Sequence, residues 1–231
     1  MALGFRTRNS GSTVQIDETY KNLALRASGN FTPGTAWNNS KWRLGSFTVT
    51  GNSPVLAWRS ATPAMLVSVT KSGSSTTYQF LIAAASGSID WWLFDEPDYV
   101  AVATAPGLRV RNPSTGAVTF DSRMKYMRVI GSGGSDFSAH DIPASASYPG
   151  MAAIVIGNVA YQYVSNIVSQ AGSPPFPWVD FVFYPMASIS GYQVSWSVKD
   201  SDPISHLPSE TKTNASQQDS LNFLVIDVTG Y

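Results

Sequence analysis

Short stretches in which apolar and polar residues alternate run along this chain, and Gly, Pro, Asn and Ser separate them. In residues 107–111, two apolar residues alternate with two arginines, which is the period of a half-buried strand. Apolar runs of strand length occur at residues 54–58, 65–69, 152–156 and 181–184. Many short strands joined by turns predict a sandwich of antiparallel strands. Residues 159–169 could form a short helix, but their Val, Ile and Tyr residues argue equally for a strand, so both readings stay open.

The first part of the chain is repeated later in the sequence. Residues 4–9 (GFRTRN) resemble residues 107–112 (GLRVRN), and the register continues through a turn that is one residue longer in the second copy. The pairs that follow are 14–17 with 118–121 and 21–25 with 125–129. Each copy predicts a hairpin followed by a third strand. A register kept over three segments indicates an internal duplication.

The similarity returns near the end of each copy. Residues 80–95 resemble residues 183–200, and residues 99–102 match residues 223–226 as the closing strand of each copy. The two copies are therefore expected to share a strand order.

We expect an all-β fold of two tandem, internally duplicated antiparallel β-sandwich domains. Copy one spans residues 1–106 and copy two spans residues 107–231. The polar stretch 201–220 has no counterpart in copy one, and it predicts an inserted loop without regular structure. No flexible linker separates the copies, so they are expected to pack closely.

The charge content favours a protein that works in an assembly. Charged residues make up 13% of the 231 residues, and Lys+Arg equals Asp+Glu at 15 each. A chain without net charge has no general attraction to phosphates or anionic lipids and little protection from self-association. We therefore expect protein partners and no nucleic acid. No stretch approaches 18 apolar residues and the first residues lack a basic region followed by an apolar run, so neither membrane insertion nor a signal peptide is expected.

The residues that carry chemistry are few. The two histidines, His140 and His206, lie in loops rich in Ser and Pro, and cysteine is absent. Asp95, Glu96 and Asp98 form one acidic cluster, for which we weigh a hard-cation site or a carboxylate pair for glycoside hydrolysis. Pro97 within the cluster favours a solvated turn instead. The sequence therefore predicts no enzyme, no catalytic residue, no cofactor and no metal.

Four arginines stand at alternating positions of the repeated hairpin, at Arg6, Arg8, Arg109 and Arg111. Strand alternation directs them outward, onto the solvated face of a sheet. An anion site is the alternative reading.

The aromatic side chains within residues 89–94 provide the one candidate contact site. Strand alternation sends Ile89, Trp91 and Leu93 to one face and Asp90, Trp92 and Phe94 to the other. When Asp95 is matched with Asp200, the corresponding outer positions of copy two hold Ser195, Ser197 and Lys199. We therefore hypothesise that Trp92 and Phe94 form a partner interface, covered by the second domain or by another subunit. A loop carrying Trp37 and Trp42 is the alternative cover.

Residues 107–123 read Gly-Leu-Arg-Val-Arg-Asn, a turn, then Gly-Ala-Val-Thr-Phe-Asp-Ser-Arg. This segment resembles a segment of small virion proteins of long-tailed, siphovirus-type bacteriophages. Those proteins lie at the tail tip or are associated with tail fibres. The resemblance covers the hairpins and closing strands, about half the chain, and residues 14–18 are a drifted version of it.

The resemblance implies a structural component of the tail tip or baseplate. It implies assembly in the host cytoplasm, a final location on the virion tail, contacts with other phage tail proteins, a homo-oligomer within the virion and contact with a host receptor. No catalytic residue carries over. The alternative function is a receptor- or glycan-binding adhesin module; a glycosidase that uses Asp95 and Asp98 ranks third.

Overall fold

The computed structural model describes residues 6–8, 14–17, 21–37, 41–102, 104–137, 141–167, 178–201, 204–206, 218 and 220–231, and all that follows concerns these residues. They form strands joined by turns, and the 3-10 turn η1 (Pro97–Tyr99) follows β9 (Ile89–Asp95). Neighbouring strands are antiparallel throughout the described pairings. The predicted all-β, antiparallel class is therefore confirmed.

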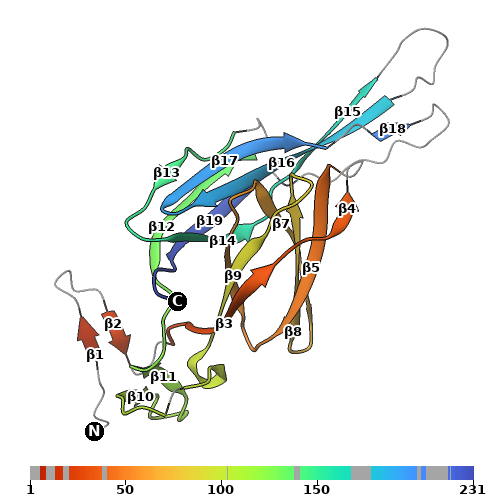
Figure 1. Cartoon of the computed structure of the whole chain (residues 1–231). Helices are drawn as coiled ribbons and strands as arrows, with labels where there is room; N and C mark the ends of the chain where they lie inside the picture. Colours follow the sequence, from red (N-terminus) through yellow and green to blue (C-terminus); the bar gives the residue numbers. More distant parts are fainter. Residues whose placement is uncertain are drawn as a thin grey trace.

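Two hairpins stand apart from the main body, at the lower left of Figure 1. The first pairs β1 (Arg6–Arg8) with β2 (Val14–Asp17), and the second pairs β10 (Arg109–Arg111) with β11 (Val118–Asp121). Their registers correspond, since the first residue of β1 faces the last of β2 and the same holds for β10 and β11. Each register also shifts before its third pair, so the two predicted hairpins share a bulge.

The remaining strands form two sheets (Figure 1). The six-stranded sheet has the order β12 (Val129–Asp136), β19 (Ser220–Asp227), β14 (Ala152–Asn158), β6 (Val55–Arg59), β9 (Ile89–Asp95), β3 (Ala24–Phe31). The nine-stranded sheet runs β13 (Ala146–Ser147), β17 (Gln193–Asp200), β16 (Trp178–Ser190), β7 (Ala64–Ser72), β8 (Ser75–Ile82), β5 (Trp42–Thr50), β4 (Thr35–Trp37), and β15 (Gln162–Ile167) and β18 (Ile204–His206) also pair with β16. Together, β15, β18 and the start of β16 extend away from the body.

The two halves of the chain share both sheets instead of forming separate sandwiches. They join at β6–β14, where Trp58 faces Ile154, and at β7–β16, where Ala64 faces Ala187. From this seam outward the six-stranded sheet reads β6, β9, β3 in one direction and β14, β19, β12 in the other. This mirrored order is what two copies related by a two-fold axis would give. The duplication and the boundary at residue 106 stay predictions.

The main core lies between the sheets and draws on both halves. Alternation in the strands turns every second side chain inward. Trp58, Phe80 and Leu93 come from the first half, and Ile154 and Val225 from the second, all with at most 1% exposure. Because one continuous core spans the seam, removing either half would expose apolar surface of the other.

The structure corrects the predicted closing strands. Residues 99–102 form no strand beyond the end of η1, and β19 takes the place that mirrors β9. The counterpart of Asp95 is therefore Asp227, and Asp200 ends a different strand, β17. A repeated turn supports this match: the Tyr99 N–H donates to the Glu96 carbonyl, and the Tyr231 N–H donates to the Val228 carbonyl.

The two segments whose structure was uncertain contain strands. Residues 162–167 form β15, so the strand reading of 159–169 is correct for these residues. Within the stretch 201–220, β18 pairs with β16 and Ser220 begins β19, so the prediction of no regular structure was wrong there. Residues 202–203, 207–217 and 219 lie outside the described residues, as do 168–169.

Candidate functional site

Trp92 and Phe94 lie on the outer face of the six-stranded sheet, as the alternation of β9 predicts. Both are nevertheless buried, with 8% and 0% exposure. They belong to an apolar cluster that joins the halves; its second-half members are Met127, Met151, Ala153, Val155, Ile226, Val228 and Tyr231. The cluster therefore combines residues of both halves of the same chain, with Leu23, Leu25 and Ala57 from the first half.

Two aromatic contacts involve Trp92 and Phe94 directly. The Phe94 and Tyr231 rings meet edge to face, with their centroids 5.7 Å apart. The Arg59 guanidinium lies 5.7 Å from the centre of the Trp92 ring and also pairs with Asp90 at 3.2 Å. What the structure shows is an interface between two halves of one chain. A partner interface with a separate subunit through Trp92 and Phe94 stays a hypothesis.

The proposed alternative cover, the segment carrying Trp37 and Trp42, lies elsewhere. Trp37 ends β4 and Trp42 begins β5, both in the nine-stranded sheet. Their cluster is separate from that of Trp92 and Phe94. This reading was wrong because the two tryptophans pair with each other across β4–β5 and pack in the other cluster.

Asp95 is a structural carboxylate at the end of β9. Its side chain is fully buried and accepts bonds from Arg26 at 2.9 Å and from the backbone N–H groups of Asn52, Ser53 and Glu96 at 2.9–3.0 Å. Burial alone would raise its pKa, but the three backbone donors and Arg26 outweigh it and hold the pKa below the usual value. With these acceptor positions occupied, Asp95 is poorly placed to bind a cation or to act as a catalytic acid.

The other members of the acidic cluster also make structural contacts. The Glu96 carboxylate pairs with Lys21 at 2.5 Å, and the Asp98 carboxylate accepts the Val118 N–H at 3.0 Å. Within the described part of the chain, no group of three or more His, Cys, Asp or Glu is placed to hold a metal ion. His140 lies outside the described residues, and His206 ends β18.

The arginines of the second hairpin bind within the hairpin. Arg109 donates to the buried Asp121 at 2.7 Å, and Arg111 donates to the Gly116 carbonyl at 2.7 Å. Asp121 also pairs with Arg123. The Arg123 bond, ahead of the Arg109 bond, holds the pKa of Asp121 far below its usual value. These contacts leave the anion-site reading without support at Arg109 and Arg111; Arg6 and Arg8 lie in β1, whose side chains are outside the description.

Sequence reasoning missed an aromatic group on the outer face of the nine-stranded sheet. The rings of Trp37 and Trp42 stack with centroids 5.4 Å apart, and Tyr184 meets their edges at 6.1 and 6.0 Å. Burial, with a smaller effect of Tyr161, raises the pKa of Tyr184 to about 12. The signal was present in the alternation of Trp42 and Leu44 in β5, but it required knowing which face of the sheet turns away from the main core.

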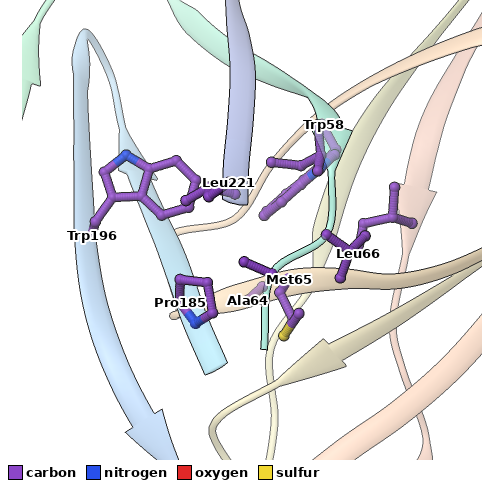
Figure 2. Close-up of a pocket in the computed structure, with 10 residues that line it drawn as sticks. Trp58, Ala64, Met65, Leu66, Pro185, Trp196 and Leu221 are labelled. Atoms are coloured by element: carbon purple, nitrogen blue, oxygen red, sulfur yellow. The ribbon is translucent and has the colours of Figure 1, made fainter. Parts of the chain in front are cut away.

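A small apolar pocket lies at the seam between the halves (Figure 2). Trp58, Ala64, Met65 and Leu66 line it from the first half, and Ile156, Val159, Ala160, Pro185, Trp196 and Leu221 line it from the second. The space that the centre of a water molecule could occupy is about 10 Å³, which is room for about one water. The pocket is a gap in packing, too small for an organic ligand.

Comparisons with known proteins leave the chain without a family. It matches no family model, no curated protein and no solved structure. Among the described residues, no helix is long and apolar enough to cross a membrane.

Proposed function

We propose that this protein is a structural component of the tail tip or baseplate of a long-tailed bacteriophage, where it makes contacts with other tail proteins and with copies of itself. The observation that carries the proposal is the hairpin that bears the resemblance, β10–β11. It forms a two-stranded sheet of its own, outside the two large sheets. An element that is not needed to complete either sheet is free to serve as a contact element.

The internal bonds of this hairpin support a rigid contact role. Asp121 fixes Arg109 and Arg123 at its base, and the Asp98 carboxylate of the first half accepts the Val118 N–H. A bulge sets its twist. A preorganised element loses little conformational entropy when a partner binds. The backbone of β1–β2 has the matching register and bulge.

The sheet architecture and the charge content agree with an assembly component. Both sheets span the two halves, so a force on one half is carried to the other through backbone hydrogen bonds at the seam. A chain with only 13% charged residues and no net charge meets little repulsion when copies pack together.

Removing the chain from the virus tests this function. A stop codon early in its coding sequence, grown in a suppressing and in a non-suppressing host, gives particles with and without the chain. We expect particles without it to have incomplete tail tips and at least a hundredfold lower infectivity, restored in the suppressing host. Complete tails and full infectivity without the chain would overturn the proposal.

A further inference from the structure

The nine-stranded sheet has one face turned away from the six-stranded sheet, called here the outer face. Phe47, Tyr78 and Phe80 belong to the core between the sheets, so their neighbours along β5 and β8 point outward. The outer-face residues of β5, β7 and β8 are Trp42, Leu44, Ser46, Thr48, Thr50, Met65, Val67, Ser68, Thr70, Ser72, Ser75, Thr77, Gln79 and Leu81. None of these residues carries a charge.

The outer face has an aromatic part and a hydroxyl part that adjoin. At one end, half-buried Trp37 and Tyr184 form the aromatic group together with buried Trp42, and half-buried Leu44 and Val67 lie beside it. At the other end, Ser and Thr dominate, and Ser46, Thr48 and Thr50 are exposed. β5 runs through both parts, because Trp42 and Leu44 are followed on the same face by these three hydroxyl residues.

The polar side chains are held in place by one another. The hydroxyls of Thr48 and Thr77 lie 2.8 Å apart across β5–β8, and the Ser68 hydroxyl donates to the Gln79 amide oxygen at 3.3 Å across β7–β8. A hydroxyl has two acceptor lone pairs besides its donor, and the amide keeps its NH₂ donors. These Ser, Thr and Gln side chains therefore retain donors and acceptors for a ligand.

This combination is matched by one class of ligand. A pyranose ring presents C–H groups on its face, which pack on aromatic rings, and hydroxyls at its rim, which exchange hydrogen bonds with Ser, Thr and Gln. Among the outer-face residues of β5, β7 and β8 a charged ligand would find no counterion, although Lys199 pairs with Tyr184 across β16–β17. A protein partner is disfavoured, since serine is depleted in protein–protein interfaces.

We propose that the outer face binds a neutral polysaccharide, with a sugar ring packed on Trp37 and Tyr184 and its neighbours bonded to Thr48, Thr77 and Gln79. The inference deepens the contact role proposed above by naming a ligand class on the host surface. Binding is measured on the purified chain and virion location on particles, so either can fail without the other.

Native gels cast with a polysaccharide give the test. The probes are dextran, mannan, laminarin and galactan, with polygalacturonate as the charged comparison, and retardation at several concentrations gives a dissociation constant. We expect at least one neutral probe to retard the chain and polygalacturonate to leave it unchanged. Trp37→Ala should weaken binding at least tenfold, and Gln79→Ala about fivefold, the loss of about one hydrogen bond.

Two controls keep the result interpretable. Tyr192→Ala removes an aromatic residue that is 61% exposed at the β16–β17 turn and should bind like the wild type. Thermal unfolding identifies a variant that has lost its fold, and Gln79→Ala then carries the test if Trp37→Ala does not fold. No retardation by any of the four neutral probes, wild-type binding by the folded variants, or preferential binding of polygalacturonate would overturn the proposal.

Discussion

Gly29 lies directly opposite Trp91 across β3–β9, and the indole ring occupies the space that a side chain at Gly29 would need. A Cβ at Gly29 would lie 2.8 Å from the indole Cζ2. The second half repeats the arrangement, where Gly133 faces Phe223 across β12–β19 and a Cβ would lie 2.6 Å from the ring. Both pairs occupy mirrored places in the six-stranded sheet, and each ring covers the exposed backbone of a glycine in an end strand.

The first prediction concerns this glycine. Gly29→Ala should lower the free energy of unfolding by about 1–3 kcal/mol, because the indole must move to admit the new methyl group. Urea denaturation measures the change. Gly34→Ala is the matched control, since a Cβ there meets nothing within 4 Å. Equal stability of the two variants would show that the ring shifts without cost.

A second prediction concerns Asp95, whose buried carboxylate accepts bonds from Arg26 and three backbone N–H groups. Asp95→Asn should lower the free energy of unfolding by about 2–4 kcal/mol, since it removes the charge and turns an acceptor into a donor. Asp141→Asn, at an exposed position, should change stability by less than about 0.5 kcal/mol. A near-neutral effect of Asp95→Asn would contradict the structural role of the carboxylate.

The third prediction separates an interface within the chain from one between subunits. Phe94→Ala should lower the free energy of unfolding by about 3–5 kcal/mol, since Phe94 is fully buried against Tyr231 of the second half. Sedimentation should give the same mass as for the wild type. A change of association state with unaltered unfolding would show instead that the ring contacts another subunit.

The fourth prediction is a loss of stability in acid. The pKa values of Asp95, Asp121 and Asp227 are all held below the ordinary 3.8 in the folded chain. A carboxylate with a depressed folded pKa stabilises the fold above its unfolded pKa, and that contribution is lost as pH falls from there toward the folded pKa. Urea midpoints should therefore fall steadily below about pH 4. Asp95→Asn should show a shallower decline, and an identical pH profile would refute the assignment.

Local patterns in the sequence predicted the strands and hairpins, because strand period and turn composition depend on neighbouring residues. The register of Arg109 with Asp121 follows from the spacing of the apolar residues around a short turn. The opposite faces of Trp91 and Trp92 follow from alternation in β9. The Gly-Leu-Arg-Val-Arg-Asn repeat also predicted two hairpins of the same register.

The sequence did not predict which distant strands pair, because all strands share the same alternation and alternation does not select a neighbour. Ile89–Asp95 was matched with the strand that ends at Asp200, although its counterpart in the sheet is β19. The connection before β9 spans residues 83–88, whereas residues 201–219 precede β19, so equal spacing misled the alignment. The cover of Phe94 by Tyr231 and the aromatic group around Trp37 both depend on such pairings.

The most direct test of the proposed function is the position of the chain on the virus particle. An antibody fragment raised against the purified protein is added to intact particles. It should label the distal end of the tail in electron micrographs. Particles grown without the chain are the control and should carry no label. Label at the head, along the tail tube, or only in the soluble fraction of the lysate would contradict a tail-tip component.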